Sequence, residues 1–392
     1  MGIKKKTIKD IEVKGKYILV RVDFNVPMEE GRVAEDMRLR AALPTIEYLI
    51  DLGAAVILCS HLGRPRGKYV PELSLHPVAS HLEGLIGLGV GFAEDCIGPV
   101  AEKAAELLEP GRVLLLENTR FHPGEKKNDE EMARQLASLA EIFVNDAFGS
   151  AHRAHASTVG VAQHLPAVSG FLLEKEIEYL GRVVTNPEKP FVAILGGAKI
   201  SDKINVIRNL LSRTDSLLIG GGMANTFLKA QGYSVAESLV EDEVIGTAQE
   251  LIDEGGRRLS LPVDVVIADR FDAAAQSRVI SKGSVPDGWR IMDVGPRTID
   301  EFGKVIETAS TVVWNGPMGV FEFAAFAVGT NEIARAVAES GAVSVVGGGD
   351  SAAAIKRSGL AEEITHISTG GRASLDMLAG VELPGVAALQ DI

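Results

Sequence analysis

Cysteine, basic charge and long apolar runs are all scarce in this sequence, and each shortage excludes a class of protein. Cys59 and Cys96 are the only cysteines among 392 residues, too few for a disulfide framework, and Cys59 lies in the apolar run AAVILC, where we expect a buried thiol. The 40 Lys and Arg residues against 53 Asp and Glu residues give a net charge of −13, which disfavours general binding to nucleic acids or membranes. No uninterrupted apolar run reaches the length of about 18 residues that a membrane span needs.

Targeting and common nucleotide-binding patterns are missing as well. The opening residues MGIKKKTIKD lack the apolar core of a signal peptide, so we expect a cytoplasmic protein in a reducing compartment. The segment ILGGAKISDK at 194–203 has two glycines and two lysines, but it does not match the common phosphate loop GxxxxGKS or GxxxxGKT. The segment GLGVGF at 87–92 lacks the GxGxxG spacing of nicotinamide-binding folds. A nicotinamide-dependent dehydrogenase therefore stays an alternative that a test of nicotinamide-nucleotide binding would decide.

Short apolar runs rich in β-branched residues alternate with helix-patterned segments along the whole chain. Runs this apolar are typical of strands buried on both faces of a parallel sheet. At about 150 residues per domain, 392 residues suggest two or three domains. We expect an α/β protein with two doubly wound, Rossmann-like parallel-sheet lobes joined by a helix and a hinge. The expected strands are 17–22, 54–59, 113–117 and 142–144 in the first half, and 191–195, 216–219, 264–268, 311–314, 343–346 and 364–368 in the second.

Three helices can be placed by their patterns. Asn128–Asp129 is a cap candidate for a helix over 130–140. Thr298 precedes Glu301 by three residues, which predicts a capping box that opens a helix at Thr298. The segment 174–184 is a further helix, and the TNPEKP that follows it predicts a stop and a linker between the lobes.

Polar side chains follow four strands in a row in the first half. Ligands of open parallel sheets bind beyond the carboxyl ends of the strands, and several arginines at such an edge make a bidentate site for a phosphate or carboxylate. A single loop arginine is more often solvated, and a metal at His152 and His155 lacks acidic or cysteine partners at ligand spacing. The residues at these ends are Asp23, Asn25, Arg38 near the start of the next helix, His61, Arg64, Arg66, Asn118, Arg120, His122, His152, Arg153 and His155.

Glycine follows the strands of the second half, in GGAKISDK, GGGMANTF, NGPMGVFE, GGGDSAAA and TGGRAS. Glycine allows a tight strand-to-helix turn and brings a ligand close to backbone N–H groups, although one such loop alone is often only a turn. Lys199 and Lys203 add positive charge, and at four residues apart they would share one face of a helix beginning near Ser201. Asp350 is either an ordinary N-cap or a residue that meets a cation such as Mg²⁺ on bound phosphates.

An arginine site in one lobe and a glycine-and-lysine site in the other suit phosphoryl transfer, where catalysis is mostly positioning and charge neutralisation. Two lobes joined by a helix could close and exclude water from the phosphoryl donor. The second alternative is a non-catalytic sugar-phosphate-binding protein that uses hinge closure. That alternative would leave the glycine loops, Lys203 and Asp350 without a role.

Nine motifs, in order along the chain, resemble those of the phosphoglycerate kinase family: RVDFNVP, SHLGRP, ENTRFHPGE, AHRAHAS, LGGAKISDK, IGGGMANTFL, VVWNGPMGVFE, VVGGGDSAAA and HISTGG. The resemblance extends from about residue 3 to 380. It implies reversible phosphoryl transfer between 1,3-bisphosphoglycerate and ADP, giving 3-phosphoglycerate and ATP, with Mg²⁺ bound to the nucleotide, in glycolysis and gluconeogenesis. We expect a monomer whose partners are these small molecules, with no nucleic-acid or membrane partner.

The resemblance also implies a role for each lobe and for particular residues. Residues 1–173 form the acid-substrate lobe, with 380–392 packing back onto it, 174–186 form the connecting helix, and 187–379 form the nucleotide-binding lobe. The acid substrate binds at Asp23, Asn25, Arg38, His61, Leu62, Gly63, Arg64, Arg120 and Arg153. The nucleotide binds at Gly197, Ala198, Lys199, Lys203, Gly222, Asn315, Glu322, Gly348, Gly349, Asp350 and Ser351, where Glu322 meets the ribose and Asp350 the metal. The catalytic groups are Arg38, Lys199, Lys203, Gly349 and Gly371, with the amide of Gly370.

One position departs from the family pattern. The family usually reads TGGGA where this chain reads TGGRA, which places Arg372 at the third glycine. The arginine would disturb the loop if the position needs a positive φ or close packing. Otherwise it is benign at a helix start or adds a charge near the phosphates, and we expect activity to survive.

Overall fold

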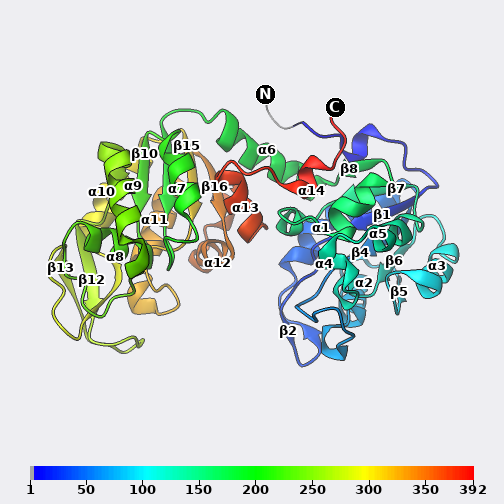
Figure 1. The fold of residues 1–392 in the computed structure, drawn as a ribbon, viewed down its shortest axis with the longest axis horizontal. Coiled ribbons are helices and arrows are strands. Elements are labelled where there is room, and N and C mark those ends of the chain that lie inside the picture. Colours follow the sequence, from blue (N-terminus) through cyan, green and yellow to red (C-terminus); the bar gives the residue numbers. More distant parts are fainter. Residues whose placement is uncertain (1–3) are drawn as a thin grey trace. The chain divides into compact units, whose positions relative to one another are not determined.

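The computed structural model describes residues 4–392, and the chain divides into two compact units (Figure 1). Unit 1 is Met1–Glu178 with Glu382–Ile392, and unit 2 is Tyr179–Val381. Each unit contains a six-stranded parallel sheet, which confirms the predicted α/β class with two doubly wound lobes. Within the described residues, no helix is both long enough and apolar enough to cross a membrane.

The sheet of unit 1 has the strand order β5-β6-β4-β1-β7-β8, which is 3-4-2-1-5-6 in order of appearance. All five residues of β4, AVILC, are buried, as expected of a central parallel strand. Helices α1 and α2 pack Ile46 and Leu82 into the core that the sheet provides. The strands are β1 (Tyr17–Arg21), β4 (Ala55–Cys59), β5 (Val90–Ala93), β6 (Val113–Leu116), β7 (Ile142–Asn145) and β8 (Ala167–Ser169), with a hairpin of β2 (Met28–Glu29) and β3 (Arg32–Val33). The helices are α1 (Met37–Asp51), α2 (His76–Ile86), α3 (Gly98–Glu106), α4 (Gly124–Lys127) and α5 (Glu130–Ala137).

The sheet of unit 2 has the order β11-β10-β9-β15-β16-β17, which is 3-2-1-4-5-6 in order of appearance, the order of dinucleotide-binding folds. Its switch point lies between β9 and β15, whose ends are level because Leu195 pairs with Asn315. The strands are β9 (Phe191–Leu195), β10 (Ser216–Ile219), β11 (Leu259–Ser260), β15 (Thr311–Asn315), β16 (Val343–Gly347) and β17 (His366–Ile367). The helices are α7 (Ile204–Leu211), α8 (Gly221–Ala230), α9 (Ile245–Gly255), α10 (Pro296–Glu307), α11 (Val328–Glu339), α12 (Gly349–Ser358) and α13 (Gly371–Leu378).

One expected strand belongs to a different sheet. The run DVVIA forms β12 (Asp264–Ala268), but it pairs antiparallel with β13 (Ser277–Ser281) and β14 (Arg290–Val294) in a separate three-stranded sheet. The expectation that every apolar run joins a parallel sheet is therefore wrong at this position. An apolar run indicates that a strand is buried, and burial alone does not distinguish a parallel sheet from an antiparallel one.

The helix ends show which local signals are reliable. Asp129 caps α5 by accepting a hydrogen bond from Met132 N at 3.0 Å, as predicted. The capping box at Thr298 is wrong, because α10 begins two residues earlier at Pro296, and the Thr298 hydroxyl bonds to Asp264 instead. The predicted connecting helix forms as α6 (Phe171–Thr185).

The C-terminal segment lies against the N-terminal part of the chain, within unit 1. Lys6 N donates to Gln390 O at 2.9 Å, and Gln390 N donates to Ala167 O of β8 at 3.0 Å. The short helix α14 (Pro384–Ala387) is tied to the loop after β7 by a bond from Gly385 N to Ala151 O at 2.8 Å (Figure 1). The last residues thus extend the edge of the sheet at β8.

Candidate functional site

A cavity of about 300 Å³ in unit 1 is lined almost entirely by cations. No carboxylate lines it, and Arg64, Arg66 and Lys126 form no ion pair with any residue of 4–392. These three cations are therefore without a paired carboxylate, and the cavity attracts anions even though the chain as a whole is acidic. The lining residues are Arg64, Arg66, Arg120, Lys126, Arg153 and His155.

Arg120 is the most deeply placed of these arginines. It is 7% exposed, and its Nη1 donates to the carbonyl of Gly63 at 2.8 Å. Burial, together with the neighbouring Arg21 and Arg153, lowers the pKa of Arg120 to about 10. The guanidinium stays charged at neutral pH, and an anion in the cavity would relieve the repulsion among these arginines.

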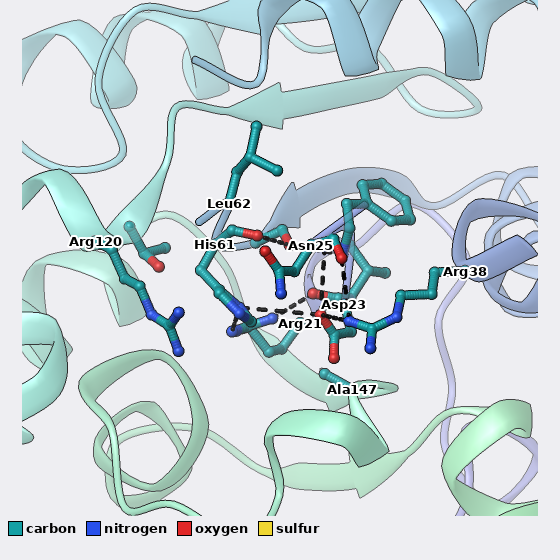
Figure 2. Close-up of polar contacts among 12 residues, drawn as sticks. Arg21, Asp23, Asn25, Arg38, His61, Leu62, Arg120 and Ala147 are labelled. Carbon is teal, nitrogen blue, oxygen red and sulfur yellow. Dashed lines mark hydrogen bonds and ion pairs between the residues drawn. The ribbon is translucent and has the colours of Figure 1, made fainter. Parts of the chain in front are cut away.

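A second polar group lies just beyond β1 (Figure 2). Arg38, from the first turn of α1, donates through Nη1 to Asp23 Oδ1 at 3.1 Å and to Asn25 O at 3.2 Å. The Asn25 side chain accepts from Gly63 N at 2.8 Å. Because Gly63 also binds Arg120, it joins this group to the cationic cavity. The backbone N–H and C=O of Leu62 are both bonded to the buried side chain of Asn118.

His61 connects the same loops to the interior. It is 4% exposed, and its Nδ1 lies 3.0 Å from Arg21 Nη2 and 4.0 Å from Asp23 Oδ1. Burial lowers the pKa of His61 well below its usual value, and nearby Arg21, Arg120 and Arg38 act in the same direction. The ring is therefore neutral at physiological pH.

The other histidines do not form a metal site with one another. His155 is buried, and burial lowers its pKa to about 4. His122 does not line the cationic cavity, and its Nε2 lies 2.6 Å from Asp95 Oδ1. In the described part of the chain, the single cluster with His, Cys and acidic ligand atoms close enough for a metal is Asp95, Cys96 and His122. Burial and the adjacent carboxylates raise the pKa of the Cys96 thiol well above its usual value, so the thiolate that a metal prefers is disfavoured.

In unit 2, two cavities lie at the carboxyl ends of the strands around the switch point and share Gly197, Ala198, Pro317 and Asp350. The smaller, of about 350 Å³, contains Lys199, Lys203 and most of the glycine loops. The larger, of about 470 Å³, is lined mainly by apolar side chains and also includes Gly222 and Glu322. The smaller cavity is lined by Gly197, Ala198, Lys199, Asp202, Lys203, Asn315, Gly316, Pro317, Gly348, Gly349, Asp350, Ser351, Gly371 and Leu375.

Glycine is required where the loops of this cavity approach each other. Gly316 has φ +94°, and a Cβ there would lie 2.3 Å from Gly196 O. Gly348 has φ +98° and caps α12 without a side chain, which leaves the first N–H groups of the helix exposed. Two side chains fix the loops: Ser351 Oγ accepts from Gly316 N at 2.6 Å, and Asn315 Nδ2 donates to Gly347 O at 2.8 Å.

Lys203 is the buried cation of this cavity, 8% exposed, and Nζ donates to Gly196 O at 2.5 Å. Burial lowers its pKa to about 8, and nearby Asp350 and Asp202 partly oppose that shift. The expected helix near Ser201 begins only at Ile204, so the prediction that Lys199 and Lys203 share a helix face is wrong. Both lysines line the cavity because the loop before α7 folds into a turn that carries them there.

Asp350 lies in the first turn of α12 and lines both cavities. Its side chain is exposed, and no residue of 4–392 forms a hydrogen bond or ion pair with it. It is therefore not an ordinary N-cap. The N-terminus of a helix favours phosphate, and a free carboxylate beside phosphate oxygens fits Mg²⁺, which prefers oxygen ligands.

Arg372 needs no special backbone conformation. It is the second residue of α13, and it is absent from the residues with positive φ among those described. Its Nε lies 2.8 Å from Asp376 Oδ1, one turn along the helix, and its side chain is 57% exposed. Arg372 therefore forms a surface ion pair, and the neighbouring Gly371 lines the smaller cavity as the family pattern predicts.

Asn118, which the sequence analysis placed at a strand end, is fully buried and also accepts a hydrogen bond from Arg120 N at 3.1 Å. Three other residues that build the site had no role in the sequence analysis. Glu125 and Ser157 are fully buried beneath the cationic cavity, together with Arg21. All three lie at an end of a family motif, which could have drawn attention to them: Arg21 opens RVDFNVP, Glu125 ends ENTRFHPGE and Ser157 ends AHRAHAS.

Comparison with known proteins gives a consistent result over the whole chain. A family model described as phosphoglycerate kinase matches residues 8–381. The phosphoglycerate kinases of Moorella thermoacetica and Chloroflexus aggregans are 60% and 58% identical to it, each over 99% of both chains. A solved structure of phosphoglycerate kinase from Coxiella burnetii superimposes with a TM-score of 0.90 at 43% identity, covering 98% of both chains. The corresponding enzyme of Pyrococcus horikoshii gives 0.87 at 37% identity, again covering 98% of both chains.

Proposed function

The chain belongs to the phosphoglycerate kinase family, and from this premise we propose which residues carry out each part of the reaction. The enzyme transfers a phosphoryl group between ATP and the carboxyl group of 3-phosphoglycerate, in the glycolytic reaction of the family. The observation that carries the assignment is the contrast between the two units. One has a cationic cavity, and the other has glycine loops around a buried lysine.

The acid substrate binds in unit 1. Arg64, Arg120 and Arg153 line the cavity and hold the phosphate by charge-assisted hydrogen bonds. Asp23 and Asn25 fix Arg38 beside the cavity, so its guanidinium is positioned for the carboxyl end and for the phosphoryl group that moves. His61, Leu62 and Gly63 complete the binding loop.

The nucleotide binds in unit 2, with its base and ribose in the larger cavity near Gly222 and Glu322 and its phosphates in the smaller one. Lys199, Lys203 and the backbone N–H groups of Gly349 and Gly371 neutralise charge on the transferring phosphoryl group. Asn315, Gly348 and Ser351 hold the loops, and Gly197 and Ala198 line both cavities.

Asp350 would hold the Mg²⁺ that accompanies the nucleotide. When bound, the metal neutralises phosphate charge. The chain's own contribution is the unpaired carboxylate at the start of α12, beside N–H groups that face the same cavity.

Residues 1–173 with 380–392, residues 174–186 and residues 187–379 are the acid-substrate lobe, the connecting helix and the nucleotide lobe in this proposal. The reaction needs both substrates in contact, so we propose that the lobes close and exclude water during transfer. We further propose a cytoplasmic monomer, with no nucleic-acid or membrane partner.

The assignment is tested by measuring ADP release from Mg-ATP in the presence of 3-phosphoglycerate, with glycerate as the control that lacks the phosphate. Saturable turnover with 3-phosphoglycerate alone is expected, because only that acid uses the cationic cavity. Equal turnover with glycerate would contradict the role of the arginines. No turnover by the folded protein would point to a different acceptor.

Arg153→Ala should mainly weaken binding of the acid substrate. Losing one charge-assisted hydrogen bond should raise KM for 3-phosphoglycerate about 10- to 100-fold. Because Arg153 lies in unit 1, kcat and KM for Mg-ATP should change less than about twofold. Arg134→Ala is the matched control, because Arg134 is an exposed arginine of the same unit, in α5, that pairs with Glu131. An unchanged KM for 3-phosphoglycerate would remove Arg153 from the site.

The depressed pKa of Lys203 predicts how activity depends on pH. The charged ammonium is the useful form, so kcat/KM for Mg-ATP should fall above the free enzyme's pKa of about 8. Bound phosphates favour the ammonium, so kcat itself should fall only at higher pH. As a control, kcat/KM for 3-phosphoglycerate at saturating Mg-ATP should stay level through this range. A profile for Mg-ATP that stays flat well above pH 8 would exclude Lys203 as the titrating group.

A further inference from the structure

Beneath the cationic cavity lies a buried network of polar side chains that lines none of the three cavities of the proposed reaction. Arg21, Ser157 and Glu125 are each fully buried, and none of them lines a substrate cavity. A buried guanidinium and a buried carboxylate are costly unless every hydrogen-bonding group is used. The hydrogen bonds of these three residues therefore indicate their role.

Glu125 forms the acidic end of this network of side chains. Its carboxylate accepts from Ser157 Oγ at 2.6 Å, from Ser157 N at 3.0 Å and from Thr119 Oγ1 at 3.2 Å. An ionised carboxylate only accepts hydrogen bonds, so the single hydroxyl proton of Ser157 points to Glu125. The Ser157 oxygen is then left with lone pairs for another donor.

Arg21 supplies that donor and is the basic residue of the network. Its Nε donates to Ser157 Oγ at 2.8 Å, its Nη1 donates to the Val22 carbonyl, and its Nη2 lies 3.0 Å from His61 Nδ1. Each of the three guanidinium nitrogens thus has a protein contact. Because Arg21 is also fully buried and lines no substrate cavity, it is placed to orient a neighbour and does not reach a substrate.

The contact with His61 has a definite chemical consequence. A guanidinium has donors and no acceptor, so Nδ1 of His61 must be the acceptor in this pair (Figure 2). The ring is neutral, so its one proton lies on Nε2. No described residue bonds to Nε2, which leaves this N–H available to a ligand.

We propose that Glu125, Ser157 and Arg21 form a positioning relay that holds His61 in the Nε2–H tautomer, so that its ring donates a hydrogen bond to the acid substrate. The inference rests on the proposed function of the cationic cavity as the acid-substrate site. Its physical basis is the fixed direction of each hydrogen bond. Arg21 can only donate, so it donates both to Ser157 and to His61 Nδ1, and Ser157 in turn donates to Glu125. With the other tautomer, an N–H of Arg21 would face an N–H of His61, and Nε2 would present a lone pair to an anion.

The tautomer is measured directly by nitrogen-15 NMR of the histidine rings in the full-length protein without ligands. The His61 signal is assigned by its loss in His61→Asn. The expected result is a neutral Nε2–H ring from pH 5.5 to 8.5, since His61 is buried near Arg21, Arg38 and Arg120 and His155 is neutral. The opposing carboxylates are Asp23, at 4.0 Å from Nδ1, and Glu125, which is linked to His61 through Ser157 and Arg21. Adding 3-phosphoglycerate should shift the Nε2 signal. An Nδ1–H ring in the free protein would overturn the proposal whatever the activity.

Variants separate the relay from simple structural support. Ser157→Ala breaks the link between Arg21 and Glu125, and it should give a mixed tautomer of His61 and raise KM for 3-phosphoglycerate about five- to tenfold. In that variant kcat and KM for Mg-ATP should stay within about twofold of wild type. Ser157→Thr keeps the hydroxyl and should restore both readouts. Ser169→Ala is the matched control, a buried serine of the same unit whose hydroxyl bonds only to Lys6 O.

Arg21→Lys is the second variant, because it keeps the charge and removes the fork that reaches three partners at once. It should change the tautomer and KM in the same direction as Ser157→Ala. A wild-type tautomer with unchanged KM in both variants would refute the relay, as would an equal rise in KM for both substrates. The expected tautomer without any turnover on 3-phosphoglycerate would instead contradict the proposed function. A signal that 3-phosphoglycerate leaves unmoved would overturn the donation to substrate.

Discussion

Lys203→Ala is expected to lower kcat about 1000-fold, or ~4 kcal/mol of transition-state stabilisation, because it removes the buried cation from the phosphate cavity. Lys203 lies in a loop whose neighbours leave it 8% exposed and bonded to Gly196 O. In such surroundings its charge is weakly screened and fixed before the reaction starts. Stopped-time assays of ADP release with saturating substrates measure the loss.

The fold of this variant should remain intact. Alanine removes a desolvated charge as well as one short hydrogen bond, so the two effects on stability partly cancel. Circular dichroism and the thermal midpoint check this directly. Lys229→Ala is the matched control, an exposed lysine of unit 2 paired with Asp242, and its kcat should match wild type. Near-normal turnover of folded Lys203→Ala would remove Lys203 from catalysis.

Arg38→Ala is expected to lower kcat about 100-fold or more, because it removes a guanidinium that is aligned before the substrate arrives. Two groups fix that alignment, the Asp23 carboxylate at 3.1 Å and the Asn25 carbonyl at 3.2 Å. Arg38→Lys retains a charge and should recover only part of the loss, since an ammonium lacks the planar fork. Single-turnover measurements with both substrates bound separate the transfer step from binding.

The same helix offers the control for Arg38. Arg40 lies two residues further along α1, is largely exposed and pairs with Asp36 at 2.9 Å. An exposed pair of this kind contributes little to stability, so Arg40→Ala should leave kcat within about twofold of wild type. If the two variants lost activity equally, the loss would reflect damage to α1, and the catalytic role of Arg38 would be excluded.

The sequence alone predicted most local features correctly. Every apolar run that was expected to be a strand forms one, and Asp129 caps its helix. Both predictions succeed because a buried strand and a helix cap depend on residues that are adjacent in the sequence. Glycine follows the strands of unit 2 as the sequence reads, and Gly316 and Gly348 adopt the positive φ that glycine favours. These signals are short-range, so a pattern over a few residues is enough to read them.

Tertiary structure decided what depends on partners distant in the chain. The run in β12 pairs antiparallel with β13 and β14, although its burial looks like that of a parallel strand. Thr298 binds Asp264 in place of its own helix end, and Lys203 is carried into the cavity by a turn in place of a helix face. In each case the local pattern permits two conformations, and contacts with another segment select one.

The relay beneath His61 shows the same division at the active site. The sequence identified His61 by its place after a strand, but the tautomer depends on Arg21, which is bonded to Ser157, 136 positions further along the chain. Composition and spacing predicted two α/β lobes, which the structure has, and proposed an arginine site and a glycine-and-lysine site. Only the folded chain decided which polar groups are buried together, because burial removes water and forces each donor to find an acceptor across the sequence.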